Sequence, residues 1–282
     1  MPDSFKDFVR FEQVSNLFYD GILENEIQVL TDKYKSNLRY GNGQIFTLSI
    51  FDNQKRKNGS LYLKNNEVFR LDNSFNYKTN YSLFFTKKYD FKKLTSFPAE
   101  SPNFLLPPYG ENLLAVLYQN KELAKEVGGF FKEYNLKFGL SKHENKLKIR
   151  KDFDEFFFVE FPYSSMADTL QRIIFYLTAI ESNKNSVLLF EEPEAHSFPP
   201  YIRMLADRIT ADEANQYFIA THSPYLFENL LGKINWNDLS VNIVYFEDYQ
   251  TKIKTLSQEN LQDALDNSVD IFFNLHRYLD HE

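Results

Sequence analysis

The sequence predicts a mixed α/β fold, in which a parallel-sheet core follows an antiparallel β lobe and a helical lobe. Three observations support this. Alternating apolar segments with turn signals fill the first third of the chain, a helical period follows, and short apolar runs then alternate with helices. We therefore expect an antiparallel β lobe over 1–102, a helical lobe over 103–161 and an α/β core over 162–282.

The β lobe is predicted as an antiparallel meander within residues 25–95. Turn signals lie at Gly41-Asn42-Gly43, Asn58-Gly59 and Asn65-Asn66, and Asn-Gly supplies the positive φ angles that a tight hairpin requires. The expected strands are the apolar alternations at 27–30, 45–51, 61–63, 68–71 and 81–85.

The helical lobe begins after Pro107-Pro108. Its segment 111–127 places leucines on a helical period, and Gly128-Gly129 are expected to interrupt that helix. The apolar run FFFVEF at 156–161 is expected to form a strand.

The last part of the chain alternates helices and strands. Val187–Phe190 is a short, continuously apolar run, which is typical of a buried parallel strand. Helices that separate such strands predict right-handed crossovers. The expected elements are a helix over about 166–181, a strand over 187–190, a helix from Pro199-Pro200, a strand over 217–220, a helix from Pro224 and a strand over 242–246.

Composition narrows the class of protein. The 282 residues suffice for a sizeable core, and 29 Phe with 18 Tyr predict that aromatic rings fill much of it. The absence of cysteine excludes disulfides and thiolate metal sites. No apolar run approaches the roughly 18 residues of a membrane span, and the first residues show no signal-peptide pattern. We expect a soluble, cytoplasmic protein that does not bind a membrane.

Charge is distributed unevenly along the chain. Residues 1–150 carry 23 basic and 17 acidic side chains, whereas residues 151–282 carry 9 and 22. The basic half could face a nucleic acid or an acidic effector protein. The alternative is a solvated surface of lysines, since no compact basic block is present.

The stretch 186-SVLLFEEPEAHSFPP-200 carries the strongest chemical signal. A buried parallel strand delivers Glu191 and Glu192 to the carboxyl edge of the sheet, where ligands bind in open α/β folds. Two adjacent carboxylates repel each other and lose hydration there unless a cation or water network offsets them. One could hold a magnesium ion through water, and the other could orient a nucleophilic water.

Two further motifs accompany it. In 217-YFIATHSPYLF-227 a strand ends at Thr221-His222, and Ser223-Pro224 then starts a helix, whose N-terminus favours anions. In 162-PYSSMADTLQR-172, Ser165 followed three residues later by Asp168 predicts a capping box on the next helix.

The order of these three motifs resembles that of the ATP-binding-cassette-like (ABC-like) ATPases, and more narrowly the stand-alone AAA-domain branch of OLD-type and RecF-like ATPases. The resemblance is good over roughly 105–250. It implies a P-loop NTPase-like core that binds ATP and Mg²⁺ and hydrolyses ATP as a nucleotide-dependent homodimer.

The resemblance also implies roles for individual residues. Val187–Glu191 corresponds to the Walker B strand, with Glu191 at the magnesium-water position, and Glu192 to the catalytic glutamate. Glu194–Ser197, which includes His196, corresponds to the D-loop at the dimer interface. His222 corresponds to the switch histidine at the γ-phosphate. Ser165–Asp168 corresponds to the signature motif, which reads the γ-phosphate bound to the opposite subunit.

Two positions depart from the family pattern. Glu191 stands where the broader family prefers Asp. Ala167 replaces a signature glycine, and its methyl group restricts how closely the backbone can approach a phosphate.

The phosphate-binding P-loop itself is missing from the sequence. The pattern G-x-x-x-x-G-K-[ST] occurs nowhere, and the only Gly-Lys pair, Gly232-Lys233, is followed by Ile234. Two explanations stay open: an N-terminally truncated product, or a degenerate relative that keeps the fold for binding. In either case we expect this chain alone to bind ATP weakly and to be inactive.

Two other functions remain as alternatives. One is a metal-dependent nuclease site built from Glu191, Glu192, Glu194, His196 and His222. The other is a non-catalytic interaction module. The sequence does not distinguish DNA repair from phage defence or another process.

Overall fold

The computed structural model describes residues 14–18, 22–30, 34–41, 45–52, 57–64, 67–71, 86–267 and 270–279. The chain divides into two compact units, Met1–Lys88 and Tyr89–Glu282, which are described separately below.

The first unit contains a five-stranded antiparallel sheet with the strands in sequence order. This confirms the predicted meander, although β2 was not expected and the expected strand 81–85 lies outside the described residues. A short 3₁₀ helix, η2 (Val14–Leu17), precedes it. The strands are β1 (Ile27–Leu30), β2 (Tyr34–Gly41), β3 (Ile45–Asp52), β4 (Lys57–Lys64) and β5 (Glu67–Leu71).

Asn58-Gly59 does not form the predicted hairpin turn. Both residues lie within β4, where Ile50 pairs with Gly59 and Phe51 with Lys57. One residue of β4, Asn58, is therefore left over opposite β3, and the register shifts as in a β-bulge. The other two predicted turns involve residues outside the described ranges.

A three-stranded sheet lies at the centre of the second unit, in the order β11-β10-β6. Its strands are β6 (Thr86–Tyr89), in which the boundary between the units falls, β10 (Val187–Glu191) and β11 (Gln216–Ala220). β10 and β11 are parallel, and α4 (Pro199–Ala211) connects them. The predicted strand–helix–strand unit is therefore confirmed, with Pro199 and Pro200 opening the helix as expected.

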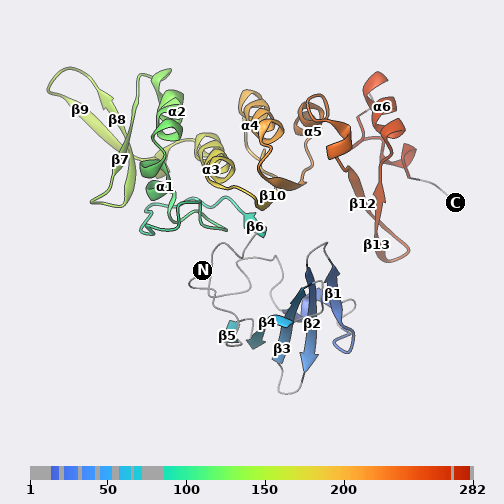
Figure 1. Cartoon of the computed structure of the whole chain (residues 1–282). Coiled ribbons are helices and arrows are strands. Elements are labelled where there is room, and N and C mark those ends of the chain that lie inside the picture. The colour runs from blue at the N-terminus through green and yellow to red at the C-terminus, as the bar shows by residue number, and fades with distance from the viewer. Residues whose placement is uncertain are drawn as a thin grey trace. The chain divides into compact units, whose positions relative to one another are not determined.

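Helices and aromatic rings pack beside this sheet. α3 (Asp168–Ser182), α4 and α5 (Pro224–Leu231) stand in a row, with α3 beside α1 and α2 (Figure 1). The ring of Phe190 on β10 lies 5.1 Å from that of Tyr176, 5.8 Å from that of Tyr217 and 6.2 Å from that of Tyr89. Aromatic rings therefore surround Phe190, whereas most of the other buried side chains of this core are Leu, Ile, Val and Ala, so the prediction of a ring-filled core holds only in part.

The helix predicted over 111–127 is two helices, α1 (Leu113–Gln119) and α2 (Lys121–Lys132). The break falls at Asn120, whose side chain accepts a hydrogen bond from the backbone N–H of Leu123 at 3.1 Å and so caps α2. Gly128 and Gly129 lie inside α2 and do not interrupt it, which corrects the prediction.

Three antiparallel strands follow α2: β7 (Lys137–Ser141), β8 (Lys146–Asp152) and β9 (Phe158–Pro162). β9 contains part of the predicted FFFVEF strand. It lies at one end of this sheet, and all five of its residues are exposed.

The strand predicted over 242–246 does not join the parallel sheet. It is β12 (Asn242–Glu247), which pairs antiparallel with β13 (Gln250–Thr255). Asp248 and Tyr249 connect the two strands with φ angles of 51° and 61°, the positive values of a tight hairpin turn. This local pairing replaces the expected crossover. The short helices η6 (Trp236–Asp238) and η7 (Leu275–Arg277) and the helix α6 (Gln258–Asp266) complete the unit.

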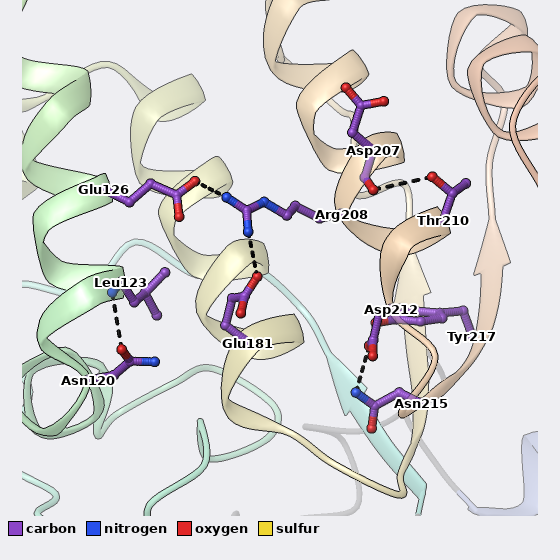
Figure 2. Close-up of polar contacts among 10 residues, drawn as sticks. All are labelled: Asn120, Leu123, Glu126, Glu181, Asp207, Arg208, Thr210, Asp212, Asn215 and Tyr217. Carbon is purple, nitrogen blue, oxygen red and sulfur yellow. Dashed lines mark hydrogen bonds and ion pairs between the residues drawn. The ribbon is translucent and has the colours of Figure 1, made fainter.

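An arginine fastens three helices together at the end of the unit drawn in Figure 2. Arg208 of α4 donates to Glu181 of α3 at 2.8 Å and also to Glu126 of α2.

Among the described residues, no helix combines the length and apolar composition that a bilayer crossing requires.

Candidate functional site

The two parallel strands end side by side at their carboxyl edge. Glu191, the last residue of β10, pairs in register with Ala220, the last residue of β11. The ladder extends one step further, because the backbone N–H of Glu192 donates to the carbonyl of Ala220 at 2.8 Å. Residues that follow β10 and β11 are therefore brought close together, as predicted for open α/β sheets.

Glu192 and His222 meet at this edge. Nε2 of His222 lies 3.7 Å from Oε1 of Glu192, and the two side chains are 88% and 43% exposed, respectively. Glu192 has a φ angle of 42°, a left-handed conformation that is costly for a residue other than glycine. Such strain is often found at functional sites, and here it turns the chain sharply after the strand.

Glu194 follows Glu192 by two residues and is only 8% exposed. Its Oε1 accepts a hydrogen bond from the hydroxyl of Thr221, whereas its Oε2 has no hydrogen-bond partner among the described residues. Burial raises the pKa of the Glu194 carboxyl, and the nearby charge of Glu192 adds to this. The hydrogen bond from Thr221 acts in the opposite direction.

His196 is exposed and ends the turn at 193–196, which precedes the start of α4. Its φ angle is 57°, and its backbone carbonyl accepts a hydrogen bond from the hydroxyl of Thr169 at 2.6 Å. Thr169 belongs to the first turn of α3, so this bond ties the loop to the beginning of that helix.

Ser165 does not form the predicted capping box. Tyr163–Ser165 is a 3₁₀ turn, η5, and the hydroxyl of Ser165 donates to the carbonyl of Pro162 at 2.7 Å. Because that turn occupies the expected start, the helix begins at Asp168, and Ala167 is its N-cap without a side-chain bond. The first turn of α3 therefore keeps its backbone N–H groups free of a side-chain cap.

Ser165, Ala167 and Asp168 are all exposed at the N-terminus of α3. The carboxylate of Asp168 lies 3.5 Å from the ammonium group of Lys93. This pairing, which the sequence did not predict, offsets the negative charge that Asp168 brings to the helix start.

The turn after β11 has the predicted helix-start chemistry. Ser223 is the N-cap of α5, and its hydroxyl accepts from the N–H of Leu226 at 3.2 Å, with Pro224 at the first helical position. The N–H of Ser223 also donates to the hydroxyl of Thr221 at 3.0 Å. His222 is thus held between two fixed neighbours.

The carboxylates do not form a dedicated metal centre. No group of three or more His, Asp or Glu residues converges closely enough to hold an ion within the described part of the chain. The five residues of the alternative nuclease site therefore do not form such a cluster among the described residues. Mg²⁺ usually keeps several waters and takes one or two carboxylates together with substrate phosphates, so the chemistry of Glu191 and Glu192 would suit it.

Gly232-Lys233 is not a phosphate-binding loop. Gly232 is the C-cap of α5 in a right-handed helical conformation, and the ammonium group of Lys233 pairs with Asp207.

Thr221 was not among the predicted site residues, and Glu194 was predicted only as part of the D-loop or of the alternative nuclease site. The sequence offered two signals: Thr221-His222 follows one predicted strand, and Glu194 comes two residues after Glu192, which follows the other. Those signals show that these residues share an edge, but they do not reveal the hydrogen bond between them.

The sequence profile of the family described as "AAA domain, putative AbiEii toxin, Type IV TA system" matches residues 9–228. No curated protein matches the chain significantly.

Three solved structures that match this chain come from work on SMC heads or SMC ATPases. An SmcHead bound to the C-winged helix domain of ScpA is 14% identical, with a TM-score of 0.45 over 90% of this chain and 82% of that one. An Smc head with an extended coiled coil, bound to the C-terminal domain of ScpA derived from Pyrococcus furiosus, is 12% identical, with a TM-score of 0.40 over 92% and 85%. A third, from work on ATP-driven dimerization and DNA-stimulated activation of SMC ATPases, is 14% identical, with a TM-score of 0.37 over 55% and 96%.

The profile match covers most of the chain, including the EEPEAH and THSP motifs. It confirms the resemblance to the AAA-domain branch of ABC-like ATPases. The chain belongs to this AAA-domain family of ABC-like P-loop ATPases.

Proposed function

We propose that this chain supplies the catalytic carboxylate and the phosphate-sensing histidine of an ATPase that works as a nucleotide-dependent homodimer. The observation that carries the proposal is the 3.7 Å approach of Glu192 and His222 at the carboxyl edge of the parallel strands. A hydrolytic water and a terminal phosphate would both fit against such an exposed carboxylate–imidazole pair.

Each of the two side chains has a task suited to its chemistry. Glu192 accepts a hydrogen bond from the attacking water and orients it, because a carboxylate is an acceptor at neutral pH. His222 is 88% exposed, and its imidazole donates a hydrogen bond to a γ-phosphate oxygen. Positioning and charge neutralisation account for most of the catalysis in phosphoryl transfer.

Glu191 is the residue proposed to hold Mg²⁺, through a water. It lies at the end of β10, is partly exposed and belongs to a site without a third converging ligand. A bound magnesium ion would neutralise phosphate charge, and the rest of its coordination would come from water and the nucleotide. Glu191 contributes one negative charge and a fixed orientation given by the strand.

The start of α3 is proposed to read the γ-phosphate bound to a second copy of the chain. Because the hydroxyl of Ser165 already donates to Pro162, the backbone N–H groups of the first helical turn are the more suitable phosphate donors. Ala167 and His196 are exposed beside them. The pairing of Asp168 with Lys93 reduces the repulsion that an incoming phosphate would meet.

The proposed partners and cellular location rest on the family description and on the charge distribution along the chain. The family description names a toxin and a type IV toxin–antitoxin system. We propose that the protein binds an effector protein or a nucleic acid and that it acts in the cytoplasm. The excess of basic side chains in residues 1–150 suits an acidic partner.

Nucleotide-dependent association tests the proposal. In a version that carries a Gly-rich Lys-Ser/Thr loop ahead of residue 1, the Glu192→Gln variant should remain dimeric with Mg-ATP in sedimentation velocity. The unsubstituted version should return to monomer as ATP is consumed. A Glu192→Gln variant that stays monomeric at saturating Mg-ATP would contradict the dimer mechanism.

A further inference from the structure

Burial of the Glu194 carboxyl costs folding free energy. The side chain is 8% exposed, and its Oε2 has no hydrogen-bond partner among the described residues. An unsatisfied buried polar atom costs free energy that a leucine of similar size would avoid. The contacts made by the other oxygen indicate what the carboxyl does.

Oε1 of Glu194 joins two loops that are distant in the sequence. It accepts from the hydroxyl of Thr221, which in turn accepts from the N–H of Ser223 at 3.0 Å. The Thr221 hydroxyl is therefore fixed from both sides. His222 lies between these two residues, so the position of its backbone depends on the same bonds.

We propose that Glu194 is a positioning residue, whose carboxyl locks the Thr221–Ser223 turn against the loop after Glu192 and thereby sets the spacing between Glu192 and His222. The importance of this spacing for hydrolysis rests on the proposed function. The hydrogen bonds of Glu194 and Thr221, and the positioning of His222 that we infer from them, are independent of the proposed function.

The loop that carries Glu194 has other supports. Backbone hydrogen bonds run from Ala195 to Glu192 at 3.0 Å and from Ser197 to Glu194 at 2.9 Å. The bond from Thr169 to the carbonyl of His196 holds the far end of the loop. Because these bonds do not involve the Glu194 side chain, the loop should keep its shape when that side chain is shortened or made apolar.

Histidine NMR on the 282-residue chain without nucleotide tests the proposal. With ¹³C-labelled histidine the chain gives five imidazole signals, and His222→Gln identifies the one that belongs to His222. In the unsubstituted chain, Glu192→Gln should shift the His222 signal, because it removes a charge 3.7 Å away. In a Glu194→Leu background the same change should shift it much less.

Conservative variants separate positioning from simple structural loss. Glu194→Gln keeps an oxygen that can accept from Thr221, so it should restore the full response of His222 to Glu192→Gln. Thr221→Val replaces the hydroxyl with a methyl group of similar size and should weaken the response as Glu194→Leu does. Glu213→Gln, at an exposed glutamate outside the site, is the matched control and should leave the response unchanged.

A full-sized response in a folded Glu194→Leu protein would overturn the proposal. If Glu194→Leu does not fold, Thr221→Val decides, and a full-sized response in that variant would overturn it equally. Because no nucleotide is present, this result is independent of whether the protein hydrolyses ATP.

Discussion

The imidazole of His222 lies 3.7 Å from the carboxylate of Glu192, although helix α4 and strand β11 separate them in the chain. The approach is a consequence of the parallel register, which places Glu191 opposite Ala220. Two residues that follow neighbouring parallel strands must emerge at the same edge of the sheet.

Removing the charge of Glu192 should slow hydrolysis. In a version that contains a P-loop, Glu192→Gln should lower the rate of phosphate release by about 10²–10⁴-fold, because the amide cannot act as a base toward water. ATP binding should persist. The exposed Glu213→Gln is the control, and an unchanged rate in Glu192→Gln would remove Glu192 from its proposed role.

The chain as given should bind Mg-ATP weakly. A P-loop supplies several backbone N–H donors and a lysine charge to the phosphates, and the sequence contains no such loop. Isothermal titration should give a dissociation constant weaker than about 100 μM, equivalent to less than roughly 5.5 kcal/mol of binding free energy. Micromolar binding would show that another part of the chain cradles the phosphates.

The stability of the chain should depend on pH through Glu194. Burial raises the pKa of this carboxyl above its usual value of 4.5, so the folded state holds the proton more tightly than the unfolded state. The resulting stabilisation is complete below the unfolded pKa and is lost as pH rises through the folded pKa. Glu194→Gln should therefore gain stability relative to the unsubstituted chain as the pH rises from the unfolded pKa of Glu194 through its raised folded pKa.

Urea unfolding at several pH values across that range would measure this difference. The exposed Glu213→Gln serves as the matched control for the loss of a carboxyl. A constant difference between Glu194→Gln and the unsubstituted chain would contradict the prediction.

The two serines that precede helices should respond differently to substitution. Ser223→Ala should lower the free energy of unfolding by about 1 kcal/mol, because it removes the cap on the N–H of Leu226. Ser165→Ala should stay within about 0.5 kcal/mol, since its hydroxyl bonds a carbonyl and does not cap α3. Chemical denaturation would compare them, and a larger loss for Ser165→Ala would restore the capping role.

Arg208 should contribute more to the free energy of unfolding than Arg203, which lies on the same helix. It bonds Glu181 and Glu126, so Arg208→Met should cost roughly 1–2 kcal/mol by leaving two partly buried carboxylates without a partner. Arg203→Met, at an exposed position of α4, is the control. Equal losses from the two variants would mean that the network contributes nothing specific.

Local patterns in the sequence were sufficient for much of the fold. The apolar run at Val187–Phe190, the prolines at 199–200 and the Ser223-Pro224 pair each depend on nearest neighbours along the chain, and each produced the predicted element. The glutamates after β10 and the histidine after β11 could likewise be assigned to one edge, because parallel strands have a fixed direction.

Other features depended on competition between local alternatives. Asn58-Gly59 can form a hairpin turn, but the pairing of β3 with β4 absorbs it as a bulge. Ser165 can cap a helix, but it lies in a 3₁₀ turn, where its hydroxyl donates to the carbonyl of Pro162. Strand β12 could have joined the parallel sheet, but the turn at Asp248-Tyr249 pairs it with β13.

The sequence by itself determined the family, the alternation of strands and helices, and the edge at which Glu191, Glu192 and His222 emerge. Only the tertiary structure decided that Glu194 is buried against Thr221 and that Thr169 ties α3 to His196. The reason is physical: periodicity and capping act over a few residues, whereas these bonds join side chains that packing alone brings within reach of one another.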